Sequence, residues 1–223
     1  MKRWRPWSGR RWPGRRPLLL VTLAAVLVAG VALAGHALWQ PVKAQLAQAL
    51  LEEAWDKALA GQPQPRPWPW ADTWPVARLS LPAADPHGAP RPLMVLAGAS
   101  GRTLAFGPGH MAGSAAPGEV GNVVIAGHRD THFRALRELA GGDVLELEDR
   151  WGGRRRYRVT RRLVTRYDDT SSLVPAADRL TLVTCWPFDA LHPGGPMRYV
   201  VVAEALEEAG RPARVAAATS PPG

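Results

Sequence analysis

Cysteine is almost absent from this chain, which has 223 residues and a single Cys at position 185. One cysteine excludes an internal disulfide framework and every metal site built from several thiolates. Acidic residues are absent from residues 1–16, and residues 17–42 contain no Lys, Arg, Asp or Glu. Internal repeats are absent as well. The length fits one domain of ordinary size with appendages.

The net charge of +9 is concentrated at the N-terminus. Seven basic residues lie in residues 1–16, so the remainder has 21 basic against 19 acidic residues and a net charge of only +2. A nucleic-acid partner therefore loses its main support, because the excess positive charge belongs to one short tail.

The uncharged stretch that follows the basic tail is long enough to span a membrane, since about 20 apolar residues suffice. Basic residues before it hold the N-terminus in the cytoplasm. The pattern predicts a basic cytoplasmic tail at 1–16, a transmembrane signal anchor at 17–40, and an exported remainder. A cleaved signal peptide is the alternative, because Ala32-Leu-Ala34 before Gly35 resembles a small-residue cleavage site. We favour the anchor, because the uncharged run continues past that site.

Residues 41–75 predict a juxtamembrane helix and a Pro/Trp-rich linker. Pro41 suits the first position of a helix over 41–60, and Gly61 suits the position just past its end. Glu53 and Lys57 form an i,i+4 pair. This helix either packs on its own domain or on the membrane, or serves as a spacer. Residues 61–75 predict an extended linker whose tryptophans dock onto the domain or the lipid. Residues 206–223 predict a flexible C-terminal tail.

The region between the linker and the tail reads as β structure. Its strands are predicted at residues 76–81, 93–97, 121–126, 145–148, 154–166, 180–185 and 199–203, and only residues 132–139 look helical. Short strands at fairly regular spacing indicate a sandwich or a barrel. The arginines of residues 154–166 are interpreted as a solvated strand face, and a nucleic-acid surface is the poorly supported alternative.

Three reactive side chains lie at predicted strand ends: His128, Cys185 and Arg198. Taken singly, Cys185 reads as a small buried apolar residue and His128 as a polar loop residue. If the strands joined by residues 186–197 are antiparallel neighbours, Cys185 and Arg198 lie side by side. A catalytic thiol needs a nearby base or cation, and the oxyanion that it forms on a carbonyl needs a hydrogen-bond donor. The three residue types together supply these functions.

These residues lie in segments that resemble the sortases, the membrane-anchored cysteine transpeptidases of bacteria. The resemblance rests on Thr181-Leu-Val-Thr-Cys185, on Gly127-His128 upstream, and on Arg198 after a loop. The segments Gly127-His-Arg-Asp-Thr-His-Phe133 and Cys185-Trp-Pro-Phe188 are most similar to the Gram-negative proteobacterial branch, class GN, near classes D and E. The likeness covers about residues 76–205, a sortase-like catalytic domain, together with the N-terminal anchor.

The resemblance implies an all-β fold, a closed eight-stranded sortase-type β-barrel with short helices, preceded by the N-terminal transmembrane helix. It also implies cleavage of a C-terminal LPxTG-like sorting signal on a secreted protein and transfer of that protein to an amine acceptor. Cys185 is then the nucleophile, His128 the acid and base, and Arg198 the oxyanion donor. Thr184 is expected to bind substrate or to orient Arg198. No cofactor or metal is needed. The chain is expected to be a single-pass protein of the inner membrane, with its catalytic domain on the periplasmic side.

Several neighbours and rival functions stay open. Asp130 either orients His128 or stabilises a turn, and His132 is either a second acid and base or a surface residue. Asp168 and Asp169 are a weak cation site. The rival enzymes are another exported cysteine peptidase or an L,D-transpeptidase acting on peptidoglycan. The non-enzymatic rival is an anchored β-barrel adhesion or assembly module with an inert cysteine.

Overall fold

The structure is a computed structural model that describes residues 15–82, 92–171, 173–174, 178–190, 192 and 194–206. The predicted basic tail lies outside these residues, apart from the backbone of residues 15 and 16. The predicted flexible tail also lies outside them, apart from residue 206. Two compact units divide the chain, Met1–Leu46 and Ala47–Gly223.

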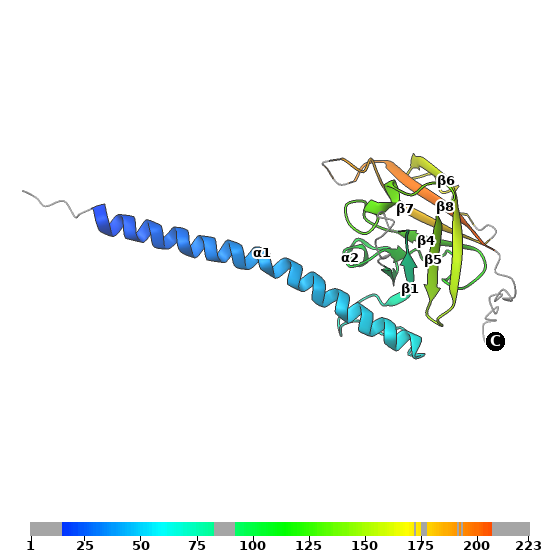
Figure 1. The fold of residues 1–223 in the computed structure, drawn as a ribbon, viewed down its shortest axis with the longest axis horizontal. Helices are drawn as coiled ribbons and strands as arrows, with labels where there is room; N and C mark the ends of the chain where they lie inside the picture. The colour runs from blue at the N-terminus through cyan, green and yellow to red at the C-terminus, as the bar shows by residue number, and fades with distance from the viewer. Residues whose placement is uncertain are drawn as a thin grey trace, which may run out of the picture. The chain divides into compact units, whose positions relative to one another are not determined.

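A single helix, α1 (Arg15–Leu59), runs from the first unit into the second (Figure 1). Its segment Leu18–His36 has a mean hydropathy of 2.6, buries none of its residues and is long and apolar enough to cross a membrane. The expectation that a separate helix begins at Pro41 is wrong, because Pro41 lies inside α1. Proline removes one backbone donor, and the Ala- and Leu-rich sequence on both sides offsets that loss with strong helix formers.

The C-terminal end of α1 packs on the second unit. Leu51, Trp55 and Ala58 form a buried cluster with Met94 and Leu96. Of the alternatives for residues 41–60, packing on its own domain is therefore correct for this end of the helix.

The end of α1 is fixed by a Schellman motif. The Gln62 N–H donates to the carbonyl of Lys57, and the Gly61 N–H donates to the carbonyl of Ala58. Gly61 has a φ of 91°, which glycine adopts without strain, so its predicted position after the helix is confirmed. The predicted pair of Lys57 and Glu53 is an ion pair of 2.6 Å.

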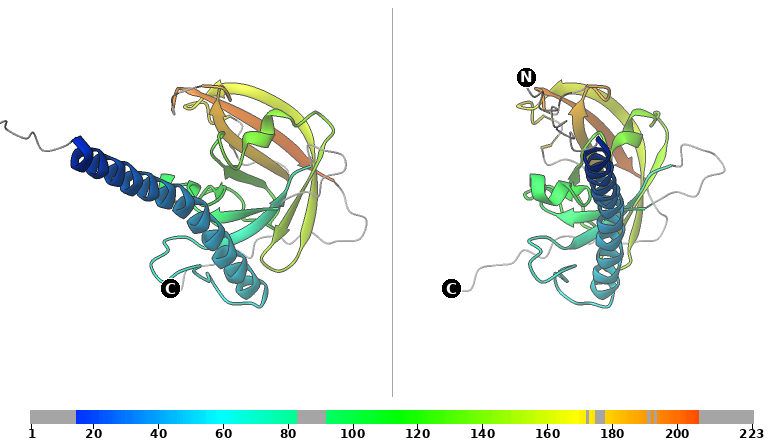
Figure 2. Two further views of the ribbon diagram at one scale, coloured as in Figure 1. Left: turned by 60° about the vertical axis from the view of Figure 1, so that its left-hand side comes forward. Right: turned by 90° about the vertical axis from the view of Figure 1, so that its left-hand side faces the viewer.

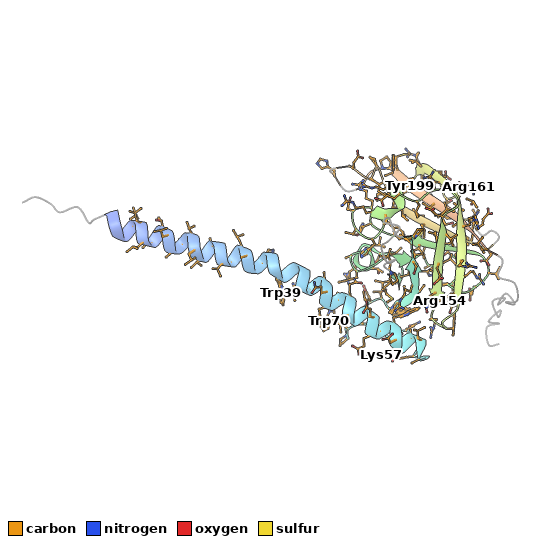
Figure 3. The ribbon with its side chains drawn as sticks, in the orientation of Figure 1. Trp39, Lys57, Trp70, Arg154, Arg161 and Tyr199 are labelled. Carbon is orange, nitrogen blue, oxygen red and sulfur yellow. The ribbon has the colours of Figure 1, made fainter. Side chains whose placement is uncertain are left out.

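The Pro/Trp-rich segment is turned and docked rather than extended. Pro65 and Pro67 are buried, and the Trp68 ring lies 4.9 Å from that of Phe106. Thr73 donates its hydroxyl hydrogen to the carbonyl of Ala97 at 2.8 Å. Trp70 is the exception, with 82% of its surface exposed (Figure 3). The segment therefore belongs to the packed unit that it introduces.

Eight strands close into a barrel, as the resemblance implied, in the order β1-β2-β3-β4-β7-β8-β6-β5. The strands are β1 (Pro75–Ser80), β2 (Leu93–Ala97), β3 (Gly109–His110), β4 (Asn122–Ala126), β5 (Val144–Asp149), β6 (Arg154–Arg166), β7 (Arg179–Trp186) and β8 (Met197–Ala205). Figure 2 shows the long strands β6 and β8 running side by side, and they are paired antiparallel. The β4–β7 pair is parallel.

The barrel interior is apolar because each strand alternates its side chains between two faces. In β7, Leu180 and Leu182 are fully buried in the main core, which they share with Val201 and Ala203 of β8. The core also contains Phe133 and Leu136, which belong to the short helical region that contains η1 (Arg134–Arg137). Burial of these side chains is the main source of stability for the barrel.

Two short elements escaped prediction from the sequence. Strand β3 has only two residues, and it bridges β2 and β4 by parallel and antiparallel pairing. Helix α2 (Gly101–Leu104) is a single turn between β2 and β3. Neither element is long enough to show a periodic pattern, so sequence periodicity carries no signal for them.

The arginines of β6 form a largely solvated face, in which several are paired with acids. Arg154 lies 3.6 Å from Glu146 and 3.5 Å from Glu148, and Arg155 lies 2.7 Å from Asp178. Arg154 and Arg161 are separated along β6 in Figure 3, and Arg161 is exposed. Ion pairs with acidic residues of the same domain therefore offset part of the positive charge of β6.

Candidate active site

The pairing of β4, β7 and β8 brings Cys185 and Arg198 together in one row, and His128 follows β4 at the same end of the sheet. In the antiparallel β7–β8 pair, Cys185 stands directly opposite Arg198, as the sequence predicted. In the parallel β4–β7 pair, Ala126 stands opposite Val183, and the Gly127 N–H continues the register by donating to the Val183 carbonyl at 3.0 Å. β4 ends at Ala126, and His128 follows it by two residues, at the same end of the sheet as Cys185.

Cys185 and Arg198 belong to the outer face of the barrel. Leu182 and Val201 belong to the core, and alternation along β7 and β8 puts Cys185 and Arg198 on the opposite face. Cys185 and Arg198 are half-buried, and His128 is exposed. Cys185 is a free thiol. A substrate can therefore approach this row from solvent without opening the core.

Gly127 lets the chain pass close to a core aromatic ring just before His128. A Cβ atom at this position would lie 2.7 Å from the Phe133 ring, closer than carbon atoms pack without displacement. The Phe133 N–H in turn donates to the His128 carbonyl at 3.0 Å. Glycine at 127 and phenylalanine at 133 thus fix where the histidine backbone leaves β4.

The Thr184 hydroxyl contacts the His128 loop and not Arg198. It donates to the Gly127 carbonyl at 2.7 Å, and Thr184 is only 2% exposed. The hydroxyl has this partner and not Arg198 because alternation directs residue 184 to the opposite face from Cys185, and the predicted role of Thr184 in substrate binding stays a prediction. Its contact ties the nucleophile strand to the segment that carries the histidine.

Arg198 is held partly by the loop that precedes it. Its Nη1 donates to the carbonyls of Gly195 and Met197, both at 2.9 Å, and its guanidinium carbon lies 5.9 Å from the centre of the Tyr167 ring. Its Nε and Nη2 make no hydrogen bond with the described residues, which leaves donors for a bound ligand.

Two neighbouring polar residues have other partners. Asp130 accepts a hydrogen bond from Arg129 Nε at 3.2 Å, and no hydrogen bond joins it to His128 in the described part of the chain. The His132 ring lies within hydrogen-bond distance of Thr131 Oγ1, at 3.2 Å. Burial, and secondarily the nearby His128, lower the pKa of His132 below its usual value. His132 is therefore biased towards the neutral form.

Sequence reasoning missed Arg129, which directly follows the histidine. Its guanidinium is 3% exposed and donates to three carbonyls of the segment between Cys185 and Arg198. Arginines in polar loops are usually exposed, so nothing in the sequence separated this one from its neighbours.

An aromatic cluster also follows the nucleophile. The rings of Trp186, Phe188 and Tyr199 lie 5.2–5.7 Å apart, in edge and stacked geometries. They pack at the border of the core and support the strand ends that carry Cys185 and Arg198.

The described residues contain no group of three or more His, Cys, Asp or Glu side chains that could hold a metal ion. Asp168 and Asp169, the weak cation site of the sequence analysis, are bonded to other residues of the chain. Asp168 pairs with Arg166 at 3.1 Å. The Thr165 hydroxyl and the Ser171 backbone donate to Asp169 and lower its pKa to about 2.

Comparison with known proteins identifies a family for the barrel domain. A family model described as "Sortase domain" matches residues 82–206. Sortase D of Bacillus subtilis (strain 168) is 36% identical over 111 residues, which cover 49% of this chain and 55% of that protein. The chain thus matches only about half the length of this curated relative.

Solved structures share the fold. Sortase C-1 from Actinomyces oris superposes with a TM-score of 0.52 at 30% identity, covering 60% of this chain and 75% of that one. A Clostridium perfringens Sortase D5 transpeptidase gives a TM-score of 0.56 at 24% identity, covering 73% of this chain and 99% of that one. The second likeness bears on the fold alone.

Proposed function

The chain belongs to the sortase family, and from that premise we propose that it is a membrane-tethered cysteine transpeptidase. It cleaves a C-terminal LPxTG-like sorting signal on a secreted protein and joins the shortened protein to an amine. The single observation that carries the proposal is that Cys185 stands opposite Arg198 at the ends of β7 and β8, with His128 just past the end of the neighbouring strand β4. A nucleophile, an acid and base, and an oxyanion donor there share one accessible face.

The reaction begins with attack of the Cys185 thiolate on the carbonyl carbon that follows the Thr of the signal. His128 as imidazolium gives its proton to the departing amine as the peptide bond breaks, which leaves a thioacyl-enzyme. The incoming amine then attacks the thioester, and His128 accepts its proton. The carbon–sulfur bond breaks, a new amide forms, and the thiolate–imidazolium pair is restored.

Arg198 stabilises the negative charge that develops on the carbonyl oxygen in both steps. Its Nε and Nη2 donors are available for this contact, while Nη1 is held by the Gly195 and Met197 carbonyls. A charged donor placed beside a forming oxyanion is among the largest contributions to catalysis. Thr184 contributes indirectly, by holding the segment that carries His128.

We also propose that, within the sortase family, the chain belongs to the Gram-negative class GN branch, near classes D and E. The domain scheme is a cytoplasmic tail at 1–16, an anchor at 17–40, a helix and linker at 41–75, a catalytic domain at 76–205, and a C-terminal tail at 206–223. The segment Leu18–His36 supports an anchor in the inner membrane, with catalysis on the periplasmic side. N-terminal sequencing of the membrane-bound protein separates this arrangement from a cleaved signal peptide.

The experiment uses the full chain in detergent, peptides of the form Leu-Pro-Xaa-Thr-Gly with Xaa varied, and triglycine as the amine. Mass spectrometry should detect a thioacyl adduct on Cys185 and a product in which triglycine replaces the segment after Thr. Cys185→Ala should give neither. Product formation by that variant would overturn the proposal.

The same experiment separates the rival functions. Hydrolysis without transfer to any amine identifies a peptidase, and cross-linked muropeptides identify a peptidoglycan transpeptidase. A thiol that iodoacetamide modifies only after denaturation indicates a non-catalytic barrel module with an inert cysteine.

A further inference from the structure

Arg129 is a buried arginine that joins the histidine segment to the loop between Cys185 and Arg198. Its Nη1 donates to the Pro187 carbonyl at 2.8 Å. Its Nη2 donates to the carbonyls of Ala190 at 3.0 Å and His192 at 2.7 Å. We call Arg129 and these three carbonyls the Arg129 clamp.

The clamp is costly to build, which argues that it has a specific task. Burying a guanidinium requires that its donors be paired, and four of the five N–H groups of Arg129 are used when Asp130 is included. Among the described residues, Asp130 is the acid bonded to it, and the Asp130 side chain is 63% exposed, so the charge of Arg129 is only partly offset. Three neutral carbonyls of one loop take the remaining bonds.

The three carbonyls belong to residues 187, 190 and 192, in the part of that loop that follows the nucleophile. The end of the loop is held separately, since the Tyr167 N–H donates to the Pro196 carbonyl at 2.7 Å and Arg198 donates to the Gly195 carbonyl. Among the described residues, the carbonyls of residues 187, 190 and 192 are thus attached to the residue adjacent to His128, and those of residues 195 and 196 are attached to Arg198 and Tyr167. The clamp therefore joins the chain just after Cys185 to the chain just after His128.

We propose that Arg129 is a positioning residue, which acts through this clamp to hold the end of the Cys185 strand in place relative to the segment that carries His128. The inference rests on the proposed transpeptidase function. Arg129 does not touch the reacting atoms in this account. It sets the separation of the two groups that do, and a displacement on the order of 1 Å between such groups costs about 10²-fold in rate.

The test compares Arg129→Lys and Arg129→Ala in the full chain. An ammonium places its three donors on one nitrogen and cannot match the fork that reaches three separate carbonyls. We expect kcat for peptide cleavage to fall about 10²-fold in Arg129→Ala and by less in Arg129→Lys, with KM changed by less than about threefold. Arg134→Ala is the control, because Arg134 is exposed in the adjacent η1 turn, and it should retain wild-type kcat.

Guanidinium at tens of millimolar, well below the molar range that unfolds proteins, should restore about tenfold of the lost kcat in Arg129→Ala and leave the wild type unchanged. A side chain that only supports folding would lower the amount of folded enzyme and would not show this rescue. An Arg129→Ala variant with wild-type kcat, or one whose loss guanidinium does not reverse, would overturn the proposal.

Hydrogen exchange tests the clamp without any enzyme assay. Amides in the loop between Cys185 and Arg198 should exchange faster in Arg129→Ala, and guanidinium should slow them again. Unchanged exchange would overturn the clamp. If the wild-type protein joins no peptide to any amine, the proposed function fails, while the exchange experiment still decides whether Arg129 holds the loop.

Discussion

The inner and outer faces of β4, β7 and β8 differ sharply, although the same three strands carry both. The inner face presents Ile125, Leu182 and Val201, which are fully buried. The outer face presents Cys185 and Arg198, which are half-buried, and the exposed His128 follows the end of β4. Successive side chains of a strand point to opposite faces, so one strand can supply both core residues and reactive residues. Substitutions on the two faces should therefore have separable effects on stability and on activity.

The largest effect on stability should come from Leu182→Ala on the inner face. Leu182 is fully buried, and truncation leaves a cavity that costs about 2–5 kcal/mol of unfolding free energy. Urea unfolding measures this loss. The specific activity of the folded fraction should stay near wild type, and a proportionate loss of kcat in fully folded protein would contradict the separation of the two faces.

On the outer face, Arg198→Ala should lower activity strongly and leave stability nearly unchanged. Loss of the oxyanion donor should lower kcat/KM by about 10²–10³-fold. The unfolding free energy should change by less than about 1 kcal/mol, since the lost hydrogen bonds of Arg198 lie in a partly exposed loop. Arg161→Ala on β6 is the matched control and should leave both quantities unchanged. Wild-type activity of Arg198→Ala would remove Arg198 from the mechanism.

Gly127→Ala should affect both faces, because Gly127 separates the core from the histidine. The added Cβ would lie 2.7 Å from the Phe133 ring, and relieving this contact should cost about 1–3 kcal/mol. The shifted His128 should also lower kcat. In the double variant Gly127→Ala, Phe133→Leu, the smaller side chain should recover part of the activity. Additive losses measured in this double-mutant cycle would show that the contact does not position the histidine.

Thr184→Val should also lower both stability and kcat, but by less than Gly127→Ala. It removes the donor to the Gly127 carbonyl and leaves a buried acceptor unpaired, at a cost of about 1–2 kcal/mol. Thr184→Ser keeps the hydroxyl and should retain most of the stability and activity. Equal thermal stability of the valine and serine variants would show that this hydrogen bond contributes nothing.

Tyr157→Phe should have the smallest effect at neutral pH. Tyr157 is fully buried, and its hydroxyl makes no hydrogen bond with the described residues. Burial raises its pKa to about 12, although the nearby Arg155 opposes the shift. The neutral hydroxyl therefore favours the folded state fully below about pH 10, and this advantage is lost as the pH rises to about 12.

Urea unfolding at several pH values tests this contribution of Tyr157. Between pH 9 and 11.5, the wild type should lose about 2 kcal/mol more than Tyr157→Phe. Identical pH profiles would show that the tyrosine does not titrate within the folded barrel.

The strands were predictable from the sequence wherever alternation extends over several residues. Leu180 and Leu182 show that alternation in β7, and the structure confirms the antiparallel pairing with β8 on which the expected placement of Cys185 beside Arg198 depended. The two residues of β3 carry no period, and the continuity of α1 through Pro41 depends on neighbours that outweigh one lost donor.

The site was predictable in its residue types but not in its supports. His128, Cys185 and Arg198 stood out because their chemistry is complementary. Arg129 and Thr184 did not, because their contacts join segments far apart in the sequence, 58 residues in the case of Arg129 and Pro187. No local pattern encodes which carbonyl a side chain will meet. The catalytic roles themselves stay predictions until the variants are assayed.

The parallel pairing of β4 with β7 has a consequence for folding. Residue 126 meets residue 183 only after the chain between them has closed a long loop, and β8 must then dock as the last strand in the sequence. Such non-local contacts form slowly, because the entropy of loop closure is lost before the contacts repay it. A newly made chain therefore carries Cys185 as an isolated thiol until the barrel closes. Cys185 and His128 are therefore brought together only when the fold is complete.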